Sequence, residues 1–194
     1  MSTKYLGAIF FIPRQGEDLS LEKLLEKAQA TEISIDSGGW VHCQWAGLID
    51  CLAFLHERSY HQLLIIRFSQ SQFLSLLPPE ADLPPGEDHF VGLEVDPSLS
   101  VALTFKQACE ALLPEVAFIA THIYDCEYNW VLEREWMVLA KDATALADEG
   151  FGLLYLNEEI SQNWMNHPQR DDRDSLPVAS GRLVFAGRGV MRWF

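Results

Sequence analysis

The segment from His122 to Glu127 holds side chains that could perform acid–base or metal chemistry. It contains an imidazole at His122, a thiol at Cys126 and carboxylates at Asp125 and Glu127. On an extended chain Asp125 and Glu127 share one face, where they could act as acid and base if burial raised the pKa of one of them. His122 lies on the other face, so a metal site would need ligands from elsewhere. The pattern favours an edge strand with solvent-facing charges and keeps a metal-assisted hydrolase as a minor alternative.

His56 and His61 are the nearest approach to a zinc-binding helix. Such a helix places two histidines four residues apart, so that both imidazoles face one ion. Here the two histidines are five residues apart, and a helix that turns about 100° per residue rotates the second imidazole roughly 140° away from the first. The spacing therefore predicts a helix end with two surface histidines and no metal site.

The glycine-rich segments do not match motifs for phosphate binding or nucleophilic catalysis. Only five residues follow Gly187-Arg188-Gly189, too few for the helix whose N-terminal amides would hold a phosphate. The patterns G-x-S-x-G, G-x-x-x-x-G-K-[ST] and G-x-G-x-x-G do not occur in the chain, which removes the common hydrolase and nucleotide-binding interpretations. We predict no catalytic residue, no metal and no cofactor, and expect a protein that is not an enzyme.

Acidic residues dominate the charge of the chain. Its 28 Asp and Glu residues outnumber its 14 Lys and Arg residues and give a formal net charge of -14, which disfavours direct binding to nucleic acids. No Lys or Arg lies between Arg67 and Lys106, so this segment could steer a basic protein into contact, although acidic surfaces also simply maintain solubility. The predicted partner-binding residues are Glu80, Asp82, Glu87, Asp88, Asp125 and Glu127.

Tryptophans concentrate in the second half of the chain and suggest a different kind of site. Tryptophan is favoured in binding pockets because it buries a large area and keeps one hydrogen-bond donor, but it is equally at home in a core. In this alternative, an aromatic pocket binds a small molecule whose cationic group meets Glu133 or Glu135. The ligand-pocket residues of the alternative are Trp130, Glu133, Glu135 and Trp136.

The cysteines and the apolar segments indicate a cytoplasmic protein. The four cysteines form no C-x-x-C pair and have apolar or strand-like neighbours, as expected for small buried side chains in a reducing compartment. No apolar run approaches the roughly 20 residues that a membrane-spanning helix needs. We therefore expect no membrane anchor.

The first half is predicted to run strand, helix, strand, strand, helix, strand. Apolar residues at helical spacing behind a Ser20 cap predict the first helix. Gly38 and Gly39 separate two strand-like segments and predict a hairpin. The predicted elements are a strand over residues 5–12, a helix over 21–28, strands over 33–35 and 40–45, a helix over 48–58 and a strand over 63–68.

Residues 78–88 form the clearest internal boundary, because their four prolines remove amide donors and prevent regular structure. Beyond this segment, Asn157 is expected to cap a helix that carries Ile160 and Trp164. The other predicted elements are strands over 90–95, 116–124, 136–140 and 151–156, a helix over 105–113 stopped by Pro114, a helical turn over 143–147, a loop over 166–175 and a closing hairpin of 182–185 with 190–194.

These elements predict a single compact α+β domain over residues 1–194, with a mostly antiparallel or mixed sheet and helices packed on one side. The order of elements after the proline-rich loop 78–88 resembles the order before it, so halves 1–77 and 89–194 could be a degenerate duplication of one α+β unit; such alternation also arises by chance.

Charge and the lack of motifs together predict a non-enzymatic cytoplasmic binding protein that neutralises a basic protein partner, as an immunity protein neutralises a nuclease-like toxin. The alternative is a small-molecule-sensing domain with its aromatic pocket between the two halves. The sequence leaves the oligomeric state open.

Overall fold

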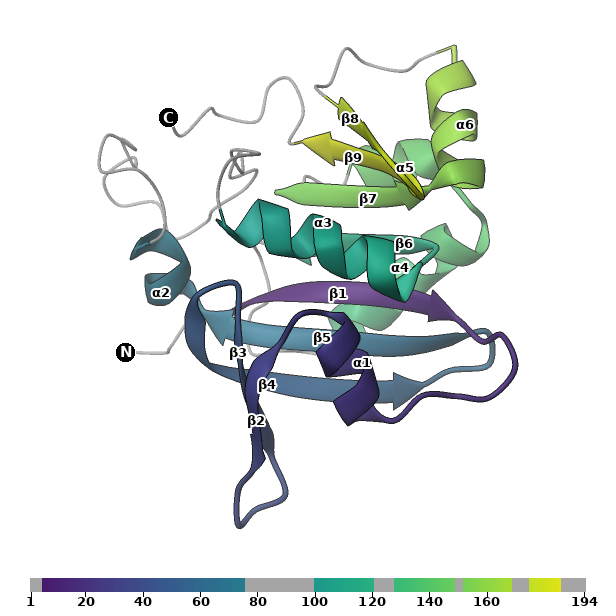
Figure 1. The fold of residues 1–194 in the computed structure, drawn as a ribbon. Helices are drawn as coiled ribbons and strands as arrows, with labels where there is room; N and C mark the ends of the chain where they lie inside the picture. The colour runs from purple at the N-terminus through teal and green to yellow at the C-terminus, as the bar shows by residue number, and fades with distance from the viewer. Residues whose placement is uncertain (1–4, 76–99, 121–127, 149–151, 169–174, 186–194) are drawn as a thin grey trace.

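The computed structural model describes residues 5–75, 100–120, 128–148, 152–168 and 175–185 (Figure 1). These residues form one nine-stranded sheet with the strand order β2-β3-β4-β5-β1-β6-β7-β9-β8. Each neighbouring pair is antiparallel. The strands are β1 (Tyr5–Pro13), β2 (Thr31–Ile35), β3 (Val41–Trp45), β4 (Leu48–Glu57), β5 (His61–Ser69), β6 (Val116–Ala120), β7 (Leu153–Asn157), β8 (Ser175–Val178) and β9 (Gly181–Phe185).

Six helices accompany the sheet in the described part of the chain, and the predicted α+β class is confirmed. They are α1 (Leu21–Lys27), α2 (Gln70–Ser75), α3 (Ser100–Leu112), α4 (Tyr128–Leu139), α5 (Ala143–Asp148) and α6 (Glu158–Asn166). None of these helices, within the described ranges, is both long enough and apolar enough to cross a bilayer.

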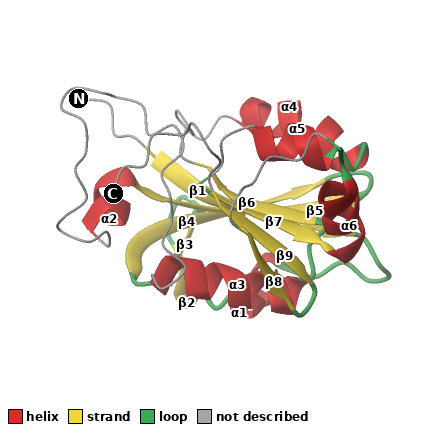
Figure 2. Cartoon of the chain, turned by 90° about the horizontal axis from the view of Figure 1, so that it is seen from above, coloured by secondary structure: helices red, strands yellow, loops and turns green. Residues whose placement is uncertain are grey.

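Helices cover both faces of the sheet. Phe10 of β1 belongs to a buried cluster with Leu25 of α1 and Phe105 of α3. Phe11, the next residue along β1, belongs to a second cluster with residues of α4, α5 and α6, because successive side chains of a strand point to opposite faces. Figure 2 shows α1 and α3 on one side of the sheet and α4 and α5 on the other. The prediction of helices on one side is therefore wrong, whereas the duplication of one α+β unit stays a prediction.

The short-range signals of the sequence are confirmed. The Ser20 hydroxyl accepts a hydrogen bond from the Lys23 amide and begins α1. Asn157 caps α6 in the same way, by accepting from the Ile160 amide at 2.9 Å. β2 and β3 pair as a hairpin around Gly39, whose φ of 82° is a left-handed conformation that glycine adopts without strain.

Two predicted elements have the wrong type. Residues 48–58 are predicted as a helix, but most of them form the strand β4. The prediction fails because β4 has apolar residues on both faces, and their spacing also fits a helix. Residues 136–140, predicted as a strand, lie at the end of α4, where Met137 and Val138 are buried while Trp136 and Leu139 are exposed.

The closing hairpin also differs from the prediction. β9 pairs with β8, which begins at Ser175 inside the predicted loop. The predicted partner segment 190–194 lies outside the described residues, as do the predicted strand 90–95, the loop 78–88 and the end of the predicted strand 116–124.

Candidate functional site

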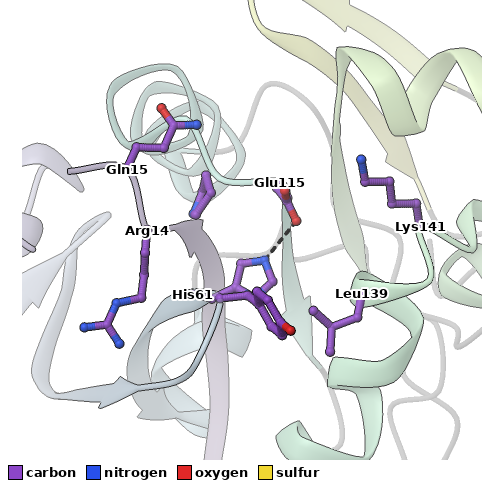
Figure 3. A pocket seen from close by; sticks show the side chains of 8 residues that line it. Arg14, Gln15, His61, Glu115, Leu139 and Lys141 are labelled. Atoms are coloured by element: carbon purple, nitrogen blue, oxygen red, sulfur yellow. Dashed lines mark hydrogen bonds and ion pairs between the residues drawn. The ribbon is translucent and has the colours of Figure 1, made fainter.

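A pocket with a volume of about 630 Å³ opens at one end of the sheet, where β1 and β4 end and β5 and β6 begin (Figure 3). We call this end the pocket end. Five lining residues precede the proline-rich segment 78–88 in sequence and three follow it. The lining residues are Pro13, Arg14, Gln15, Tyr60, His61, Glu115, Leu139 and Lys141.

The position of β1 between β5 and β6 brings these residues together. Pro13 at the end of β1 pairs with His61 at the start of β5. On the other side of β1, the Glu115 amide donates to the Phe11 carbonyl at 2.9 Å. Residues that are far apart in sequence therefore meet because they end or begin adjacent strands.

His61 and Glu115 form the base of the pocket. The Nε2 atom of His61 lies 2.8 Å from Oε2 of Glu115. The His61 side chain is 2% exposed and the Glu115 side chain 26% exposed. The Nδ1 atom of His61 is buried and has no hydrogen-bond partner within the part of the chain that is described. Because an ionised carboxylate can only accept hydrogen bonds, Nε2 of His61 donates this bond to Glu115.

The electrostatics of the pocket keep Glu115 ionised. The hydrogen bond from His61 lowers the pKa of Glu115, and its effect exceeds the opposing effect of burial. The charges of His61 and Lys141 lower this pKa further. Because the folded state has the lower pKa, the ionised carboxylate stabilises the fold above its unfolded pKa, and this contribution disappears as the pH falls through the folded pKa.

Glu115→Gln is expected to lower the free energy of unfolding by about 1 kcal/mol at pH 7, because the amide oxygen still accepts from His61 but carries no charge. The difference from wild type should shrink as the pH falls towards 3. Urea unfolding at several pH values measures it, with Glu26→Gln, an exposed carboxylate of α1, as the control. A difference that grows with acidity would contradict the assignment.

The two cations that line the pocket are held by other carboxylates. The Arg14 guanidinium binds the Asp18 carboxylate and donates to the Arg58 carbonyl at 2.7 Å. The Lys141 ammonium donates to both carboxylate oxygens of Glu159 at 2.7 Å. In Figure 3 the charged end of Arg14 points away from His61 and Glu115, whereas the charges of Lys141 and Glu115 interact. Both cations are thus paired with carboxylates that do not line the pocket.

Carboxylates are in excess around the pocket end. β7 also ends here: the amide of Asn157, its last residue, donates a hydrogen bond to the Glu115 carbonyl at 2.9 Å. The acidic side chains at this end are Glu17, Asp18, Glu57, Glu115, Glu135, Asp142, Glu158 and Glu159. The basic ones are Arg14, Arg58, Arg134, Lys141 and Arg182, of which Arg14, Arg58 and Lys141 are paired with carboxylates.

The residues predicted for partner binding all lie outside the described residues: Glu80, Asp82, Glu87, Asp88, Asp125 and Glu127. Of the ligand-pocket residues, Trp130 and Glu133 belong to α4, but their side chains are not described. The carboxylate of Glu135 binds Arg58 at 2.6 Å, and Trp136 is exposed. Neither Glu135 nor Trp136 lines the pocket between β1, β5 and β6.

The prediction of two surface histidines at a helix end is wrong. His56 lies on β4 and His61 on β5, and the His61 side chain is buried. Because the two histidines lie on strands, helical spacing does not decide whether they share a metal ion. Within the described ranges, no group of three or more His, Cys, Asp or Glu side chains is arranged to hold a metal ion, and His122 lies outside these ranges.

The described residues form an antiparallel α+β protein with a pocket at one end of its sheet, where carboxylates are in excess. No protein-family model, no curated protein and no solved structure matches the chain. A proposal of function therefore depends on the geometry and charge of the pocket end.

Proposed function

We propose that this protein binds a basic protein partner through its pocket end and neutralises it, as an immunity protein masks a nuclease-like toxin. The observation that carries the proposal is the excess of carboxylates around a pocket whose own cations are already paired. A nuclease-like toxin has a basic surface that binds phosphates. A protein that masks this surface must present negative charge in place of the phosphates, and the carboxylates of the pocket end supply such charge.

The exposed carboxylates of the pocket end would act mainly on the rate of encounter. Glu17 and Glu158 are exposed, and charges of this kind steer a partner of opposite sign before contact is made. The partially buried Glu115 would act after contact, since removal of a sheltered charge changes the dissociation rate more than the association rate.

The partner should be a basic, toxin-like protein, and the product of a neighbouring gene is the first candidate. Co-expression is expected to suppress its toxicity, and the association rate of the purified proteins should fall as salt is added. An association rate that does not change with ionic strength would remove electrostatic steering from the proposal.

A double variant, Glu17→Gln with Glu158→Gln, is expected to slow association about three- to tenfold at low salt. The matched control is Glu32→Gln with Asp50→Asn. It removes two exposed carboxylates near the starts of β2 and β4, at the end of the sheet opposite the pocket end. Surface plasmon resonance with the basic partner measures both. Equal slowing by the two double variants would indicate a general charge effect and contradict binding at the pocket end.

Sensing of a small molecule is the second proposal, and one observation favours it. The pocket draws its lining from both sides of the proline-rich segment 78–88 and has a volume of about 630 Å³, which is within the range of small-molecule sites. Saturable binding of a small organic cation together with failure to bind any basic protein would favour this second proposal over the first.

A further inference from the structure

We propose that the pocket at the pocket end receives a single basic side chain, arginine or lysine, whose cationic head contacts Oε1 of Glu115. The inference rests on the proposed function, in which this side chain belongs to the basic partner. It assigns the pocket a ligand class, a guanidinium or ammonium group on an alkyl stem.

The His61–Glu115 pair supplies the anionic base of the site. His61 occupies Oε2 of Glu115, and Oε1 has no hydrogen-bond partner among the residues that the structure describes. Glu115 is sheltered but keeps 26% of its side-chain surface exposed. A carboxylate in such a position interacts with a cation more strongly than one on the open surface, because solvent screens it less.

The walls of the pocket suit the stem of a basic side chain. Pro13 and Leu139 contribute apolar surface, and the exposed ring of Tyr60 lies at the rim. Lysine and arginine pack their methylene groups on apolar surface while the charged head stays near polar groups, and an aromatic face attracts the head itself. The pocket thus offers a contact for each part of the side chain.

An anionic ligand is the competing interpretation, since Arg14 and Lys141 line the pocket. An anion would have to separate Lys141 from Glu159, where two contacts of 2.7 Å hold it, and Arg14 from Asp18. It would also have to lie next to the ionised Glu115 carboxylate. A cation needs neither rearrangement, so the geometry points to a cation.

Titration of the full chain with N-acetyl-arginine amide, N-acetyl-lysine amide, N-acetyl-norleucine amide and inorganic phosphate tests the assignment by NMR shift changes. The two basic amides are expected to bind with dissociation constants on the order of millimolar, and the norleucine amide and phosphate should not bind. Binding by phosphate, or equal binding by the norleucine amide, would overturn the proposal.

Glu115→Gln is expected to weaken binding of the arginine amide about tenfold, whereas Glu32→Gln, which removes an exposed charge of β2 away from the pocket end, should leave it nearly unchanged. Glu159→Gln provides a test that spares the His61–Glu115 pair. It releases Lys141 from its carboxylate partner, so the freed ammonium should compete for Glu115 and weaken binding. Unchanged binding in both Glu115→Gln and Glu159→Gln would overturn the assignment.

Failure of the pocket assignment is distinguishable from failure of the proposed function. Arginine-amide binding that depends on Glu115, without neutralisation of any basic partner, would support the pocket and contradict the proposed function. Salt-dependent partner binding that Glu115→Gln leaves unchanged would support the function and contradict the pocket.

Discussion

Replacement of Trp45 by alanine is expected to lower the free energy of unfolding by about 3–5 kcal/mol. Trp45 is 1% exposed at the end of β3, and its ring stacks on Phe68 with centroids 6.0 Å apart. Its Nε1 atom donates to the Ala28 carbonyl at 2.9 Å, which ties the end of α1 to the sheet. The truncation leaves a cavity and an unpaired buried carbonyl. Urea unfolding followed by circular dichroism measures the loss.

Two variants separate the causes of this loss. Trp45→Phe keeps an aromatic ring against Phe68 but leaves the Ala28 carbonyl without its donor, for an expected cost of about 1–3 kcal/mol. Trp40→Ala serves as the matched control, because Trp40 is 54% exposed and lies near the opposite end of the same hairpin. Trp40→Ala should lower the free energy of unfolding by much less than Trp45→Ala does. Equal costs for Trp40→Ala and Trp45→Ala would contradict the burial of Trp45.

Elements whose signals lie within a few residues could be predicted from the sequence. Ser20 and Asn157 begin α1 and α6 because a side-chain oxygen accepts from an amide three residues later, and that spacing is visible in the chain. The hairpin at Gly39 likewise depends on one residue with a positive φ.

Segments that are apolar on two faces could not be assigned by pattern. β4 lies inside the sheet between β3 and β5, so Leu55 packs against the core on one face while Phe54 packs against that on the other. An apolar run of this kind fits a helix and a buried strand equally well, and only its pairing with neighbouring strands decides. The end of α4 shows the converse case, because its short apolar run fits a strand although it is helical.

The candidate site could not be predicted because its two central residues are far apart in sequence. His61 and Glu115 are separated by 54 residues, and β1, which comes before both in the chain, lies between the strands that carry them. Spacing therefore linked His61 to His56 rather than to Glu115. The composition indicates an acidic protein but not where its acidic side chains gather. Their position depends on which strands begin or end at the pocket, and this is visible only in the fold.

The acidity and the pocket support one account of function better than two separate ones. A negative surface alone would serve solubility, and a pocket alone would serve any small ligand. Here Arg14 and Lys141 are each paired with a carboxylate, and Glu115 at the base of the pocket is ionised. A basic side chain entering this end meets negative charge during its approach and again at the base, which links encounter to anchoring.

Gly181→Ala is expected to lower the free energy of unfolding by about 3 kcal/mol, at the upper end of the usual cost of overpacking. Gly181 begins β9 and pairs with Asn157 of β7. A Cβ atom at this position would lie 2.1 Å from the Leu156 carbonyl oxygen and 2.9 Å from the Asn157 Cα atom. Both are backbone atoms of a paired strand, so the clash can be relieved only if β7 and β9 separate locally.

Hydrogen exchange locates the effect of Gly181→Ala, because separation of the strands should speed exchange at the amides of β7 and β9 and leave β4 and β5 protected. Gly38→Ala is the matched control. The three atoms nearest to its Cβ atom would all belong to side chains, the closest being Cδ1 of the exposed Trp40 ring at 3.0 Å, which can rotate away. This variant should change the free energy of unfolding by less than about 1 kcal/mol. Equal costs for the two variants would show that β7 and β9 do not approach as closely as their register requires.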